Sequence, residues 1–312
     1  MPRHTNPRPT PPAARASAHS PQAPHTFELV ELRWVLKALA AVFALALVCG
    51  YITVCVVYSR TQWQLVLHPS REIQKTPAAV DLAFEEVHFG ADSSGQPQLD
   101  GWWLPSDLPS DPTVLLLHSG DGSIADALAQ AHILHDARLN VLLFDYRGFV
   151  HSGGQHPTQA TMEADADSAL TYLITIRNLA PRSVVVFGTG VGGSLAVRLC
   201  GEHPQLPALI LQFPRGDLKT QAVRDGSPFF PARLLFTQDF PLADPLHTLA
   251  TPKLLITSDE TKAPIDLHEA ADPKMILTLT GAENEDAILQ SSIRRFLDSY
   301  VASPPATLAP NP

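Results

Sequence analysis

The sequence predicts an α/β protein with a mostly parallel central sheet and helices on both faces, preceded by one N-terminal transmembrane helix. Two observations predict this architecture. Continuous apolar runs, typical of strands that are buried on both faces, alternate with segments of helical spacing over most of the chain. A long run without any charged residue lies nearer the N-terminus. The first pattern predicts the sheet, and the second predicts the membrane span.

The uncharged run is Ala38–Tyr58, and residues 32–60 are predicted to form the transmembrane anchor. A helix of about 20 apolar residues crosses the ~30 Å hydrocarbon layer of a bilayer. A cleaved signal peptide is less favoured, because its apolar part is typically ~7–15 residues long and ends in an A-x-A-like site. Lys and Arg lie on both sides of the run, so the orientation is left open, with the translocated side preferred for the C-terminal domain.

The composition excludes several classes of function. The chain has 312 residues, 45% of them hydrophobic and 17% charged, and its formal net charge is -9. It has no long basic run, so nucleic acid is not expected as a partner, because phosphate binding needs clustered Lys and Arg. We find no Cys/His spacing typical of zinc and no G-x-G-x-x-G with the acidic partner that dinucleotides require. The sequence therefore predicts no metal and no other cofactor.

The predicted globular domain spans residues 65–302, and disordered Pro-rich tails are predicted at residues 1–31 and 303–312. Two short runs with strand character, FEEVHFG and LDGWWLP, open the domain. Strands and helices then alternate in the order TVLLLH, IADALAQAHILHDA, NVLLFDY, TMEADADSALTYLITIRNL, SVVVF, SLAVRLCGEH, PALILQF, PKLLITS, KMILTLT and ENEDAILQSSIRRFLDSYV. Ligands of such sheets bind beyond the carboxyl ends of the strands, so we expect the site in the loops that follow the strands.

One of these loops has an unusual composition. The stretch VVVFGTGVGGSLA, Val184–Ala196, has the outline of a strand, a sharp turn and a helix. Where such a turn carries a nucleophilic serine, it reads G-x-S-x-G with the serine in the middle. The middle residue here is Gly190. The pattern therefore predicts the turn without its nucleophile.

Five stretches in order carry a resemblance to a known family: LLLHSGDGS, LNVLLFDYRGFVHSGG, FGTGVGGSLA, PFFPARLLF followed by PKLLITSDETKAP, and GAENEDA. Together they resemble the α/β-hydrolase superfamily, in particular its membrane-anchored, serine-aminopeptidase-like branch. The resemblance runs from about Leu65 to Tyr300, and it implies the α/β-hydrolase fold. In the D-Y-R-G stretch, Val150 stands where the family has a glycine.

The resemblance also assigns the positions of a catalytic triad. The family's nucleophilic serine corresponds to Gly190, and its histidine corresponds to Asn284. Its acid corresponds to Asp259 or Glu260, and the register between these two stays open because the loop is shorter than usual. Only the acid is present, so the resemblance implies a degenerate triad.

The positions equivalent to the family's oxyanion hole are Ser119, Gly120 and Val191. Ser119 is also the best candidate for a relocated nucleophile, although the usual role of such a serine is hydrogen bonding within its loop. Acidic residues in the loops at this edge of the sheet are interpreted as a solvated rim rather than a cation site.

Acyl transfer needs an attacking oxygen, a base that takes its proton and an acid that orients the base. Gly190 has no side chain, and the amide of Asn284 does not accept a proton near neutral pH. The sequence therefore favours a non-catalytic, membrane-anchored pseudo-hydrolase that binds a small ligand or a protein partner. The alternative is an active serine hydrolase, esterase- or peptidase-like, with a relocated nucleophile.

Overall fold

The computed structural model describes residues 32–70, 72–108, 110–154, 156–225, 231–258, 267–281 and 284–301. The predicted tails at residues 1–31 and 303–312 lie outside the described residues. The chain divides into two compact units, the first ending at Thr53 and the second beginning at Val54.

Helix α1 (Leu32–Thr61) contains the predicted membrane span. Its most apolar window has a mean hydropathy of 2.5, and within the described residues none of this window is buried against protein. A core helix of a soluble domain would be mostly buried, so this observation argues against that alternative. The length and the apolar composition of α1 are sufficient to cross a bilayer.

The second unit is built on an eight-stranded sheet, counted over the described residues, with the order β10-β9-β8-β7-β4-β6-β3-β2. Strand β3 runs antiparallel to its neighbours β2 and β6, and the other neighbouring strands pair in parallel. Every residue of β4, β6 and β9 is buried, as the continuous apolar runs predict. The strands are β2 (Glu85–Ala91), β3 (Pro97–Leu104), β4 (Thr113–Leu117), β6 (Asn140–Phe144), β7 (Val184–Gly190), β8 (Leu209–Pro214), β9 (Lys253–Thr257) and β10 (Lys274–Thr278).

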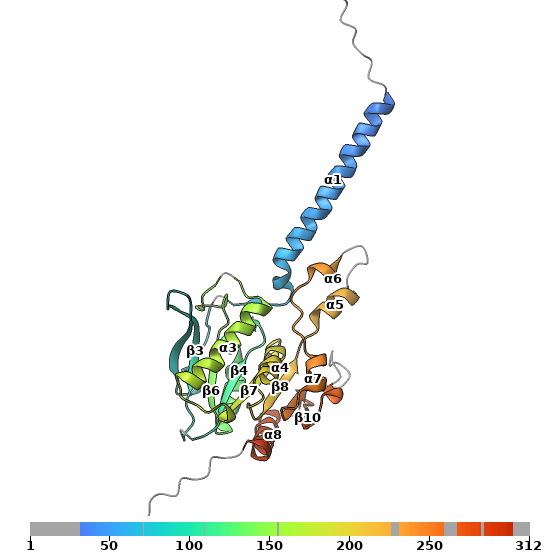
Figure 1. The fold of residues 1–312 in the computed structure, drawn as a ribbon. Helices are drawn as coiled ribbons and strands as arrows, with labels where there is room; N and C mark the ends of the chain where they lie inside the picture. Colours follow the sequence, from blue (N-terminus) through green and yellow to red (C-terminus); the bar gives the residue numbers. More distant parts are fainter. Residues whose placement is uncertain are drawn as a thin grey trace, which may run out of the picture. The chain divides into compact units, whose positions relative to one another are not determined.

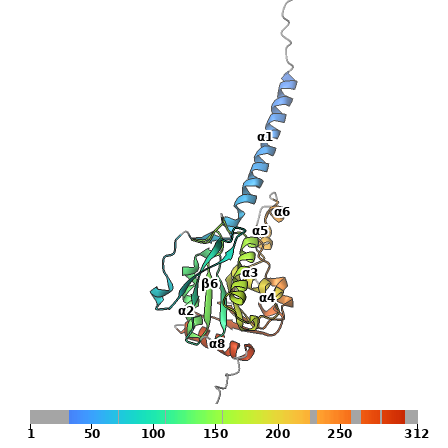
Figure 2. The ribbon, with the colours of Figure 1, turned by 60° about the vertical axis from the view of Figure 1, so that its left-hand side comes forward.

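Helices cover both faces of this sheet (Figures 1 and 2). One buried cluster packs residues of α3, α4 and α7 against one face, and a second packs residues of α2 and α8 against the other. The predicted fold class is therefore confirmed. These helices are α2 (Leu128–Asp136), α3 (Gln159–Thr175), α4 (Gly192–Glu202), α7 (Ala243–Thr248) and α8 (Glu285–Tyr300).

Shorter elements connect the main strands and helices. A two-stranded parallel sheet joins β1 (His68–Pro69), which follows α1 in the chain, to β5 (Asp121–Gly122), which follows β4. Helices α5 (Leu218–Asp225) and α6 (Ala232–Leu235) follow β8. The short 3-10 helices are η1 (Gln62–Leu65), η2 (Pro77–Val80), η3 (Ile124–Ala127), η4 (Pro181–Ser183) and η5 (Leu267–Glu269).

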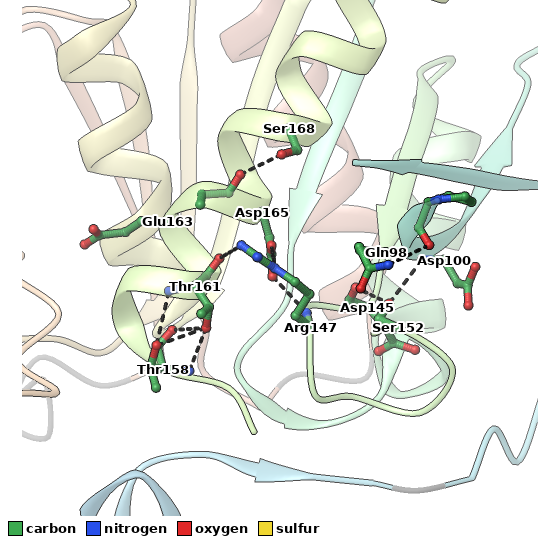
Figure 3. A network of polar contacts seen from close by, with 12 residues as sticks. Gln98, Asp100, Asp145, Arg147, Ser152, Thr158, Thr161, Glu163, Asp165 and Ser168 are labelled. Carbon is green, nitrogen blue, oxygen red and sulfur yellow. Dashed lines mark hydrogen bonds and ion pairs between the residues drawn. The ribbon is translucent and has the colours of Figure 1, made fainter. Parts of the chain in front are cut away.

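The D-Y-R-G stretch after β6 is held to α3 by a buried ion pair (Figure 3). The Arg147 Nε donates to Asp165 Oδ1 at 2.5 Å, and the Arg147 backbone N–H donates to Asp165 Oδ2 at 2.8 Å. Burial raises the pKa of Asp165, while its bonds with Arg147 lower it. Farther along the loop, the Ser152 hydroxyl donates to the Asp145 carbonyl oxygen at 2.6 Å. These contacts fix the loop that borders the candidate site.

Candidate functional site

The turn between β7 and α4 has the geometry that the sequence predicts. Strand β7 ends at Gly190, Val191 follows, and α4 begins at Gly192. Gly190 has a φ of 55°, in the left-handed region that residues with a Cβ rarely adopt. Its carbonyl oxygen accepts a hydrogen bond from the Arg215 backbone N–H at 2.8 Å. The turn is therefore a sharp elbow that presents Gly190 at the carboxyl end of a central strand.

Glycines on both sides of this elbow let the strand and the helix approach closely. A Cβ on Gly188 would lie 2.6 Å from the Gly192 carbonyl oxygen. A Cβ on Gly192 would lie 2.2 Å from the Leu117 carbonyl oxygen of β4. Both distances are shorter than any real Cβ contact, so these two positions accept only glycine in this backbone.

The loop after β4 lies directly over Gly190. A Cβ on Gly190 would lie 2.7 Å from the Ser119 Cβ and 3.0 Å from the Ser119 Cα. The Ser119 hydroxyl accepts a hydrogen bond from the Asp121 backbone N–H at 3.3 Å, which is a bond within its own loop. The place where the first carbon of a side chain at residue 190 would stand is therefore occupied by Ser119.

The cavity beside the elbow is small. Its volume is about 50 Å³, whereas ligand sites typically measure ~300–1,000 Å³ and one water takes ~30 Å³ of liquid. It has room for water but not for a substrate-sized molecule. It is lined by His118, Ser119, Asp121, Ser123, Asp126, Ala127, Gln130 and Thr189.

Gly120 and Val191, the other two predicted oxyanion-hole positions, lie close to each other. Leu67, from the segment after α1, packs beside them. A Cβ on Gly120 would lie 2.7 Å from the Leu67 Cδ2 and 2.8 Å from the Val191 Cγ2. Leu67 is only 1% exposed. The next residue, His68, donates its backbone N–H to the Gly120 carbonyl oxygen at 3.0 Å. The chain between the apolar helix and the domain therefore packs directly on the loop beside the elbow.

Of the remaining predicted triad positions, the structure describes only Asn284. Asn284 is exposed and caps the N-terminus of α8, where its carbonyl oxygen accepts from the Ile288 backbone N–H at 3.1 Å. It lies in the loop after β10, and β10 is three strands from β7 in the sheet. Asp259 and Glu260 follow β9 and lie outside the described residues.

The chain is similar in sequence and in structure to several known proteins. No family model matches the chain. An uncharacterized protein of Mycobacterium tuberculosis is 32% identical over 279 residues, which cover 84% of this chain and 95% of that protein. The α/β-hydrolase domain-containing protein WAV2 of Arabidopsis thaliana is 31% identical over 147 residues, 46% of each chain. An esterase of Pyrococcus furiosus has a similar structure, with a TM-score of 0.58 at 19% identity, covering 76% of this chain and 99% of the esterase.

This chain has the α/β-hydrolase fold. It is a member of the same family as the mycobacterial protein, with which it aligns over almost all of that protein's length. The structural likeness to the esterase is at low identity and bears on the fold alone.

His118, which lines the small cavity beside the elbow, is a buried histidine. His118 is 2% exposed, and neither of its ring nitrogens has a hydrogen-bond partner among the described residues. Burial lowers the pKa of His118 to about 3. Its ring packs on Tyr146 and Phe149, with centroids 4.5 and 5.2 Å away. His118 therefore stays neutral at physiological pH and is not bonded to the Ser119 hydroxyl.

Asp145, the first residue of D-Y-R-G, is a site residue that sequence reasoning missed. Its Oδ1 lies 3.7 Å from the His118 Nε2, too far for a hydrogen bond, and accepts from the Ile124 backbone N–H at 3.0 Å. Burial is the main cause that raises the pKa of Asp145 to about 7. Because burial favours the neutral form of both groups, His118 has lost its proton well before Asp145 ionises, so the contact is not an ion pair. The sequence feature that could have identified Asp145 is its position as a charged residue directly after the apolar run of β6.

Asp145 should make the stability of the domain depend on pH. A carboxyl whose folded pKa is raised favours folding at low pH, and this contribution is lost as the pH rises from the ordinary value of 3.8 to about 7. Asp145→Asn keeps an oxygen acceptor but cannot ionise. Between pH 5 and pH 8, the free energy of unfolding of the parent should therefore fall by about 3 kcal/mol relative to that of Asp145→Asn.

Urea denaturation of both proteins at the two pH values measures this difference. Asp298→Asn, at an exposed position of α8, is the control for substituting a carboxyl. Parallel pH profiles for the parent and Asp145→Asn would show that Asp145 ionises in the folded protein as it does in the unfolded chain.

The hydroxyl group of Ser194 and the thiol group of Cys200, both on α4, are buried in the core. Ser194, in the first turn of α4, is 3% exposed and donates its hydroxyl to the Pro241 carbonyl oxygen at 2.6 Å. Cys200, on the same helix, is 1% exposed, and burial raises the pKa of its thiol to about 12. Neither group has the properties of an activated nucleophile.

Proposed function

We propose that this protein is a membrane-anchored α/β-hydrolase-like protein that binds a ligand or a protein partner and does not catalyse acyl transfer at its elbow. One observation carries the proposal: the elbow presents Gly190, and Ser119 occupies the space above it. The elbow thus has neither an attacking group nor room beside it for a tetrahedral intermediate.

The surrounding groups support this proposal. A general base works best with a pKa near the operating pH, whereas burial lowers the pKa of His118 to about 3. Asn284 is an exposed amide at a helix N-terminus. An active enzyme with Ser119 as its nucleophile, the alternative, needs a base for the Ser119 proton, and His118 does not bond to it.

A binding role also has structural support away from the elbow. A cavity of about 790 Å³ lies between α4 on one side and α7 with the loop that follows it on the other. This volume is within the range of small-molecule sites. Its lining is mainly apolar and includes Val197, Leu206 and Leu249, with the charged Arg198 and Glu202 also present. A ligand in this cavity would not touch the elbow.

Ester turnover tests the proposal. The full-length protein in detergent should hydrolyse short p-nitrophenyl esters no faster than an equal concentration of an unrelated membrane protein. Ser119→Ala should leave that background rate unchanged. Turnover above background that Ser119→Ala abolishes would instead establish the relocated nucleophile.

A further inference from the structure

The residues that follow α1 are bonded to α6. Gln62, the first residue after α1, is 4% exposed although its side chain is polar. Its Nε2 donates to the Leu235 carbonyl oxygen at 3.0 Å, and its Oε1 accepts from the Thr237 backbone N–H at 2.6 Å. Both bonds lie within the second unit. They fix α6 beside the point where the chain leaves α1 (Figures 1 and 2).

The two segments that Gln62 joins each expose a leucine. Leu234, in α6, is 83% exposed, and Leu65, at the end of η1, is 62% exposed. A single exposed leucine is ordinary on a soluble surface. Two exposed leucines on segments bonded to the end of a helix that can span a membrane are explained by contact with lipid, because removing apolar surface from water is favourable.

Charge and distance agree with this explanation. Arg60, in the last turn of α1, and Arg233, in α6, are both exposed, and arginine near a bilayer surface is attracted to anionic lipid headgroups. Helix η1 covers four residues, so Leu65 lies at most about 8 Å from the end of α1 at the 3-10 rise of ~2 Å per residue. The headgroup layer on each side of a bilayer is about 5–8 Å thick. Leu65 is therefore close enough to the end of α1 to reach this layer.

We propose that Leu65 and Leu234, with Arg60 and Arg233 beside them, form a juxtamembrane surface that inserts into the headgroup region of the bilayer that α1 crosses. The proposal rests on the membrane anchoring stated under the proposed function. We expect lipid to contact this surface, because only a few residues separate Leu65 from the helix that spans the bilayer. Leu67, two residues after Leu65, packs on Gly120 in the loop beside the elbow.

Depth-dependent fluorescence quenching tests this surface on the full-length protein in lipid vesicles. An environment-sensitive maleimide dye is placed at Leu234→Cys, and quencher lipids carry a nitroxide close to the headgroup. The matched control is Leu108→Cys, another exposed leucine (51%), in the loop between β3 and β4 at the opposite end of the sheet. Both variants carry Cys49→Ser and Cys55→Ser, and the remaining Cys200 is buried.

The dye at residue 234 should be quenched several-fold more than the dye at residue 108. Quenching at 234 no greater than at 108 overturns the proposal and leaves the leucines as a contact for a protein partner. A third sample separates this failure from failure of the anchor. A dye on the native Cys49 of α1, with Cys55→Ser, should be quenched by lipids that carry the nitroxide deep in the acyl chain. Without that quenching, the anchor and the juxtamembrane surface are both refuted.

Discussion

Gly192→Ala is expected to destabilise the domain by about 3 kcal/mol or more, the largest stability effect that we predict. The added Cβ would lie 2.2 Å from the Leu117 carbonyl oxygen and 2.6 Å from the His118 carbonyl oxygen. Both contacts are with backbone, which no change of rotamer relieves. Strand β4 and α4 would have to separate, and the loop that carries Ser119 would move with them.

Gly201→Ala in the same helix is the matched control. A Cβ at Gly201 would meet nothing within 4 Å, so alanine there should stabilise α4 by about 0.5–1 kcal/mol through its helix propensity. Urea denaturation of the three proteins in the same detergent measures both effects. If Gly192→Ala were as stable as Gly201→Ala, the close crossing of β4 and α4 at the elbow would be wrong.

Gly190→Ser is expected to destabilise the domain by about 2–4 kcal/mol and to restore no hydrolysis. Its Cβ would contact the Ser119 Cβ at 2.7 Å, and a residue with a Cβ at a φ of 55° adds strain. Ser119→Gly removes the contacting carbon. The double variant should therefore recover about 0.5–3 kcal/mol relative to the sum of the two single changes, the range of coupling between residues in contact.

Activity in this series should need a further change. Asn284 cannot take the proton of a serine at residue 190, so the double variant should remain inactive. Adding Asn284→His supplies an imidazole, and a positioned base is typically worth ~10²–10⁴-fold in rate. Any hydrolysis should therefore appear first in the triple variant. Hydrolysis by Gly190→Ser alone would contradict this series, because it would require a base that the described residues do not show.

The sheet and the elbow could be predicted because local pattern determines them. Continuous apolar runs are buried on both faces of β4 and β6, and Gly190 has the positive φ that an elbow requires. Val150, which stands where the family has a glycine, also has a positive φ, of 31°. The chain therefore adopts a backbone that favours glycine even where the glycine itself is missing.

The closure of the site could not be predicted, because it depends on contacts between residues far apart in sequence. Ser119 contacts Gly190 from the loop after β4, and Leu67, just before the two-residue strand β1, packs on Gly120 in that loop. The direction of β3 is likewise set by its partners, since antiparallel and parallel strands share the same period. The pKa of Asp145 depends on burial that only the packed structure reveals.

The central claim is that the unmodified protein has no activated serine, and labelling with a fluorophosphonate tests it most directly. Such a probe reacts covalently with a serine whose hydroxyl is activated by a base, whatever the natural substrate. The full-length protein should show no more label than the same protein after heat denaturation, and peptide mass spectrometry should find no adduct at Ser119 or Ser194. Stoichiometric labelling of the native protein at a single serine, lost on denaturation, would contradict the account and identify the nucleophile.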